Sequence, residues 1–127
     1  MTPIRMERAE SGIRTVLAFT EAFNRQDLQA MLNLVSEECL FQAPSPAPDG
    51  AVHKGKIAIT QYWQEYFSSM ARAHLRIEET FGFGFRCIIL GRFDWVDATG
   101  MPAHLRGIDI YQVHNNLITE QLSYTKA

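Results

Sequence analysis

The hydrophobic pattern of this 127-residue chain changes period near residue 73, from the 3.6 residues of a helix to the 2 residues of a strand. The alternating runs that follow predict strands over residues 73–81, 85–97, 103–113 and 117–125. Helices first and a strand meander afterwards are typical of an α+β domain, with the helices packed on one face of an antiparallel sheet. We therefore expect a single domain over residues 1–127, in which residues 1–8 form a loosely held tail.

Three helices are predicted before this change. The first has an apolar stripe at helical spacing, made by Ile13, Val16, Leu17, Thr20 and Phe23. Asp27 can cap a short second helix, because its carboxylate can accept hydrogen bonds from free backbone N–H groups. The buried side of that helix would be Leu28, Met31, Leu32 and Val35. The third helix follows Gly55 and repeats apolar residues most clearly, at Ile59, Tyr62, Trp63, Tyr66, Phe67 and Met70.

A short strand and a long loop are expected between the second and third helices. The strand covers residues 39–43, and prolines with a glycine break the segment 44–52 into a loop. Loops of this length in a compact domain often form the rim of a binding site.

Asp109 is a lone carboxylate inside an aliphatic and aromatic strand. Alternate side chains of a strand share a face, so Asp109 lies beside Leu105, Gly107 and Tyr111 on a face that is otherwise apolar. Burial of an ionised carboxylate is costly unless the group is paired, or unless its pKa rises until it becomes neutral. The residue therefore belongs either to a structural hydrogen-bond network or to a functional site, where it could exchange a proton with a carbon next to a carbonyl group.

The register of the last hairpin has two solutions. A two-residue turn at Asn115-Asn116 fits the tolerance of asparagine for positive φ, and it would place Tyr124 opposite Gly107. A bulged turn would instead place Gln121 and Ser123 on the side of Asp109. A slip of one residue exchanges the side chains on the two faces of the last strand, so Tyr124 and Ser123 are rival site residues.

The chain resembles the SnoaL-like branch of the nuclear transport factor 2-like superfamily over residues 8–126. The resemblance is most specific in His104–Val113 with Leu117–Tyr124, and in Phe23–Leu28 between the first two helices. It implies a cone-shaped α+β barrel in which three helices pack on the concave face of a curved antiparallel sheet and enclose a pocket. Members include steroid isomerases, polyketide cyclases, epoxide hydrolases and non-catalytic binding proteins.

The resemblance also implies roles for individual positions. Asp109 corresponds to the strand aspartate that SnoaL-like cyclases use as acid and base. Phe19 and Ala43 occupy the positions of the tyrosine and of the basic aspartate of ketosteroid isomerases, and neither can exchange a proton. Ser123 takes the last-strand position of the epoxide hydrolases' acidic residue. The implied function is a cofactor-independent cyclase or isomerase for a small cyclic or polyketide-like carbonyl compound. The alternative is a binding protein without catalysis.

An aromatic set favours a small apolar or aromatic organic ligand over a polar one. Such residues are more often core than pocket wall, but in this fold the concave sheet serves as both. The predicted ligand-binding residues are Phe19, Phe23, Phe41, Trp63, Phe93, Trp95, Tyr111, Ser123 and Tyr124, around Asp109 as the catalytic group.

Charge, apolar runs and residue spacing exclude several classes of function. The net charge is -2 and the basic residues form no run, so nucleic-acid binding is not expected. No apolar stretch approaches ~20 residues, so no membrane span is expected. The first residues lack an apolar signal core, which predicts a cytoplasmic protein with Cys39 and Cys87 reduced. The histidines show no metal-ligand spacing, so neither a metal nor a cofactor is predicted.

The sheet face opposite Asp109 mixes aliphatic side chains with charges of both signs. It carries Ile88, Leu90, Arg92, Asp94, His104, Arg106, Ile108 and Ile110. This mixture fits a subunit interface better than open water, so we expect a homodimer through the convex face of the sheet.

Overall fold

The computed structural model describes residues 4–126. Its helices are α1 (Ile4–Asn24), α2 (Leu28–Leu32) and α3 (Lys56–Ser69). Its strands are β1 (Val35–Gln42), β2 (Val52–Lys54), β3 (Ala71–Phe83), β4 (Arg86–Val96), β5 (Pro102–His114) and β6 (Leu117–Thr125). The α+β class and the order of helices and long strands are confirmed.

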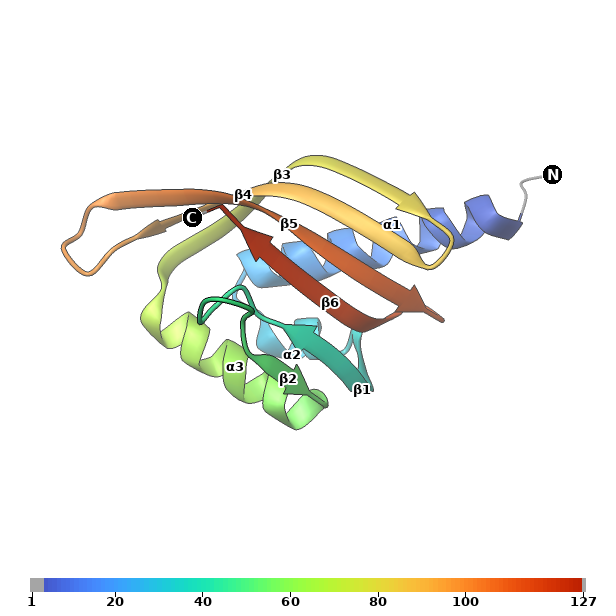
Figure 1. Cartoon of the computed structure of the whole chain (residues 1–127), viewed down its shortest axis with the longest axis horizontal. Coiled ribbons are helices and arrows are strands. Elements are labelled where there is room, and N and C mark those ends of the chain that lie inside the picture. The colour runs from blue at the N-terminus through green and yellow to red at the C-terminus, as the bar shows by residue number, and fades with distance from the viewer. Residues whose placement is uncertain (1–3, 127) are drawn as a thin grey trace.

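The six strands form one curved sheet in the order β2-β1-β6-β5-β4-β3. Neighbouring strands are antiparallel except β1 and β6, which run parallel, and the sheet stays open between its β2 and β3 edges. Helix α1 packs mainly against β3, whereas α3 packs against β1 and β2 (Figure 1). The helices cover the concave face and leave the other face of the long strands without a covering helix.

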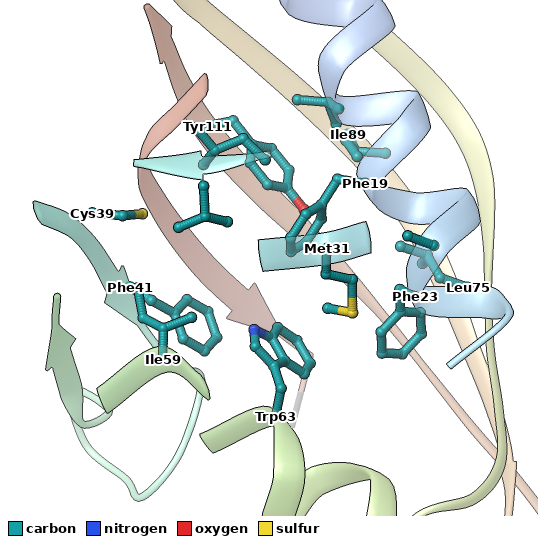
Figure 2. Packing of buried hydrophobic residues seen from close by; sticks show 14 of the residues in the cluster. Phe19, Phe23, Met31, Cys39, Phe41, Ile59, Trp63, Leu75, Ile89 and Tyr111 are labelled. Carbon is teal, nitrogen blue, oxygen red and sulfur yellow. The ribbon is translucent and has the colours of Figure 1, made fainter. Parts of the chain in front are cut away.

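Aromatic side chains form the centre of the core. Trp63 of α3 stands between Phe41 of β1 and Phe23 of α1, with ring centroids 5.5 and 5.7 Å away (Figure 2). Phe19 of α1 contacts both Trp63 and Tyr111 edge-on, at 6.4 and 6.2 Å. Aromatic pairs in this geometry add stabilisation beyond the area they bury, so α3 is fixed to the sheet through these rings.

The second helix ends earlier than predicted, β1 begins earlier than the predicted residue 39, and one strand was not predicted. Val35 begins β1 instead of ending the second helix, because α2 ends at Leu32 and the chain becomes extended at once. The missed strand β2 begins at Val52, the last residue of the predicted 44–52 loop, and its His53 pairs with Phe41. Three residues are too few for an alternating pattern to be recognisable.

The predicted cap at the start of α2 is confirmed, and a second side chain fixes the end of α1. The Asp27 carboxylate accepts a hydrogen bond from the Ala30 backbone N–H at 3.0 Å and caps α2. At the end of α1, the Asn24 side chain bonds both the N–H and the C=O of Leu75, which joins the helix to β3. Helix α1 begins at Ile4, so residues 4–8 are helical, and their expected loose attachment stays a prediction. Residues 1–3 of that tail lie outside the described residues.

The last hairpin combines both predicted solutions. Asn115 and Asn116 form a tight turn with φ of 51° and 63°, and Val113 pairs with Ile118. A bulge at Gln112/Val113 then shifts the register, so that Ser123 pairs with Asp109. Ser123 therefore shares the Asp109 face. The expected pocket position of Tyr124 is wrong: its side chain is 54% exposed and lies on the convex face.

Candidate functional site

A cavity of about 390 Å³ opens between α3 and the concave face of the sheet. One wall consists of α3, and the other consists of β4, β5 and β6, with β1 and the following loop at the rim. The lining residues are Phe41, Pro44, Ser45, Tyr62, Trp63, Glu65, Tyr66, Ser69, Met70, Phe93, Trp95, Leu105, Asp109, Gln121, Ser123 and Thr125. Its size and aromatic walls suit a small organic molecule.

The cavity brings together six of the predicted site residues and leaves four outside. Asp109, Phe41, Trp63, Phe93, Trp95 and Ser123 line it. Phe19, Phe23 and Tyr111 are buried behind it, around an inner space of about 20 Å³, and serve as core. Tyr124 faces away from the cavity, for the reason of register given above.

Asp109 has the environment of a perturbed acid. Its side chain is 6% exposed. Burial raises its pKa from 3.8 to about 6, while Ser123 and Gln121, which face the carboxyl group from β6 as hydrogen-bond donors, lower it in part. An acid that titrates near neutral pH can both accept and return a proton.

Tyr62 and Tyr66 belong to the cavity wall but were not predicted as site residues. Burial raises the pKa of Tyr62 to about 12 and raises that of Tyr66 further, and the charge of Asp109 adds to both effects. Both phenols therefore stay protonated at neutral pH and act as hydrogen-bond donors. The signal was present, because both residues belong to the same helical stripe as Trp63, but such a stripe reads equally well as core.

Two buried side-chain atoms within residues 4–126 have no hydrogen-bond partner: the indole nitrogen of Trp63 and Oδ1 of Asp109. Both residues line the cavity. Nearby polar groups are satisfied, since Gln121 Nε2 donates to the Tyr111 hydroxyl at 3.2 Å. Buried polar groups without partners are rare in folded proteins and often mark functional positions.

The two positions that the resemblance aligns with the tyrosine and the basic aspartate of ketosteroid isomerases are occupied by apolar residues. Phe19 and Ala43 are buried, as their side chains require, and provide no proton-transfer group.

Within residues 4–126, no three histidine, cysteine, aspartate or glutamate side chains come together in a way that could bind a metal ion. In the same part of the chain, no helix is both long and apolar enough to cross a bilayer.

The Asp109 carboxyl group should titrate near pH 6, and Ser123→Ala should raise this pKa further. The hydroxyl group of Ser123 favours the ionised form, so its removal leaves desolvation less opposed. Carbon-13 NMR of the Asp109 carboxyl group between pH 3 and 8 measures both values. Ser45→Ala, at the rim of the cavity, is the control and should leave the titration unchanged. A midpoint near the model-peptide value of ~3.9 would contradict the buried environment.

Comparisons with known proteins agree with this geometry. A proposed polyketide cyclase from Xanthomonas campestris pv. campestris is 25% identical with a TM-score of 0.84, covering 94% of this chain and 93% of that one. A nuclear transport factor 2-like protein of unknown function from Mesorhizobium loti is 32% identical with a TM-score of 0.78, covering 94% of both. TerC, co-crystallised with polyporic acid, shares the fold at 16% identity and a TM-score of 0.81, covering 91% of this chain and 92% of that one.

None of the curated proteins matches the chain. The family model of the SnoaL-like domain matches residues 16–121, which include all the long strands except the end of β6. This match covers most of the chain and agrees with the resemblance seen in the last hairpin. The protein therefore belongs to the SnoaL-like domain family, within the nuclear transport factor 2-like fold.

Proposed function

We propose that this protein binds a small, largely apolar carbonyl compound in the cavity and exchanges a proton with it through Asp109. The observation that carries the proposal is a buried carboxyl group with a raised pKa and an unpartnered oxygen, in the wall of an aromatic cavity. The reaction class is cofactor-independent isomerisation or cyclisation, in which removal of a proton next to a carbonyl group is the first step.

The cavity walls support an aromatic or cyclic ligand. Phe41, Trp63, Phe93 and Trp95 provide flat apolar surfaces, and most of the exposed surface of the cavity wall is apolar. The raised pKa of Asp109 supports proton exchange with the ligand, because a base with a pKa of about 6 is ionised at neutral pH and still returns its proton readily.

A binding protein without catalysis is the second candidate. It is favoured by the lack of a second proton-transfer group at Phe19 and Ala43, since the phenols of Tyr62 and Tyr66, with their raised pKa values, stay protonated at neutral pH. Asp109 would then only accept a hydrogen bond from the ligand. The two candidates share the cavity and differ in whether a proton moves.

The convex face of the sheet is proposed as the interface of a homodimer. Its centre is apolar, with Ile108 40% exposed and Tyr124 54% exposed. Charged residues surround it, including Arg106, which bonds Glu78 at 2.9 Å. An apolar centre with a charged rim is typical of subunit interfaces.

We also place the protein in the cytoplasm, where the two buried free thiols would stay reduced.

Proton exchange tests the catalytic proposal. With 2-tetralone, a bicyclic ketone with a benzylic carbon next to the carbonyl group, the protein should accelerate deuterium uptake from heavy water. The rate should rise between pH 5 and 7 with a midpoint near 6, because only ionised Asp109 can remove the proton. Asp109→Asn should lower the rate by about 10²- to 10⁴-fold, while Glu38→Gln on the outside of β1 should not.

Each result of this experiment separates the candidates. Binding of 2-tetralone without accelerated exchange would identify a binding protein. Acceleration that survives Asp109→Asn would remove Asp109 from the chemistry. No binding at all would contradict the proposed ligand class.

Substitution on the convex face tests the dimer. Ile108→Glu should convert a dimer into a monomer in sedimentation equilibrium, because it places an unpaired charge at the centre of the interface. Ile57→Glu is the matched control: Ile57 is also exposed, at 80%, but lies on α3. A wild-type protein that sediments as a monomer would contradict this assignment of the face.

A further inference from the structure

Trp63 carries an unusual donor for a buried tryptophan. Its side chain is 6% exposed, yet the indole nitrogen has no hydrogen-bond partner among the described residues. Figure 2 shows this nitrogen on the edge of the ring nearer Phe41, another residue of the cavity wall. A buried N–H group without an acceptor is costly, and buried tryptophans usually find a partner. An acceptor that arrives with a ligand would remove this cost.

The second unpartnered atom complements the first. Asp109 Oδ1 can accept a hydrogen bond, and Trp63 Nε1 can only donate one. Asp109 comes from β5 and Trp63 from α3, and both residues line the 390 Å³ cavity and the inner space behind it. Both atoms are themselves buried, so a ligand must reach into the space that these two residues share in order to meet the donor on one side and the base on the other.

We propose that the indole N–H of Trp63 donates a hydrogen bond to the carbonyl oxygen of the ligand and stabilises the negative charge that forms there when Asp109 removes a proton from the neighbouring carbon. This inference rests on the proposed function and deepens it. It makes Trp63 a catalytic residue and defines the ligand as a compound with an acceptor oxygen next to an acidic C–H group.

The step balances without a further reactant. The Asp109 carboxylate takes the proton, and the C–H electron pair becomes a carbon–carbon double bond. The carbonyl π electrons move to the oxygen, which becomes the enolate oxygen facing Trp63. Asp109 then returns the proton to the same carbon or to another carbon of the conjugated system, and the carbonyl group forms again. A fixed donor at the oxygen favours the enolate because its charge is greatest there.

The tyrosines of the same wall are the rival donors. Tyr62 and Tyr66 are half-buried, and neither hydroxyl is among the buried atoms that lack a partner. Neither phenol therefore needs a ligand oxygen for its hydrogen bond. Trp63 does, and its ring is held by stacking on Phe41 with an interplanar angle of 18°. A donor held in place before the reaction stabilises charge better than a mobile one.

Nitrogen-15 NMR of the indole groups tests the proposal on the unaltered protein. The chain has two tryptophans, and Trp95→Phe assigns the two indole signals. The titrations use 2-tetralone and 2-methylidenetetralin, which has the same shape but carries a methylidene group in place of the carbonyl oxygen. At pH 7.5, 2-tetralone should move the Trp63 N–H signal downfield and bind about tenfold more tightly than the alkene. The alkene should leave that signal nearly unchanged.

A second measurement links the hydrogen bond to the chemistry. Trp63→Phe, once its cooperative melt shows that it folds, should lose the preference for the ketone and slow deuterium exchange by about 10²-fold or more. Tyr62→Phe and Tyr66→Phe should keep the preference. If either tyrosine variant loses it and Trp63→Phe does not, the donor is the tyrosine and the proposal is wrong.

The remaining outcomes also decide the question. Equal affinity for the two compounds with an unmoved Trp63 signal would overturn the role of Trp63 and leave the apolar cavity intact. A Trp63 signal that follows the Asp109 titration without ligand, and does not respond to the ketone, would show that the two side chains bond each other. Binding of neither compound would overturn the proposed function and this inference with it.

Discussion

The burial of one carboxyl group among aromatic rings is the constraint on which the candidate site depends. Removing the Asp109 charge from water raises its pKa from 3.8 to about 6. At neutral pH this lowers the free energy of unfolding by about 3 kcal/mol. The rest of the fold must supply this energy. The aromatic contacts of Trp63 with Phe41 and Phe23 hold α3 over the sheet, where Asp109 is buried.

The bulge in the β5–β6 hairpin determines which side chains surround this carboxyl group. Without it, Leu122 would face Asp109, because opposed positions would continue the register of Val113 and Ile118. With it, Gln121 and Ser123 lie on that face and moderate the pKa. A shift of one residue thus separates an acid in a purely apolar setting from one that titrates near neutral pH.

The sequence predicts those parts of the fold that depend on local chemistry. Alternation placed Asp109 on the concave face, the side chain of Asp27 predicted the start of α2, and Asn115-Asn116 predicted the turn. The choice between Ser123 and Tyr124 could not be predicted, because a bulge depends on tertiary packing and leaves no pattern of its own. The same limit applies to Tyr62, since a helical stripe does not distinguish a cavity wall from the core.

The pH dependence of stability tests most directly whether Asp109 is held in the cavity at a cost to folding. Urea unfolding of wild type and Asp109→Asn between pH 4 and 7 gives the difference between the two, in which the other titrating groups cancel. Because the folded-state pKa is raised, wild type should be most stable relative to the variant at pH 4 and should lose about 2.5 kcal/mol as the pH rises through 6 to 7. A wild type that instead gains stability over Asp109→Asn as the pH rises would identify a paired structural carboxylate and contradict the account.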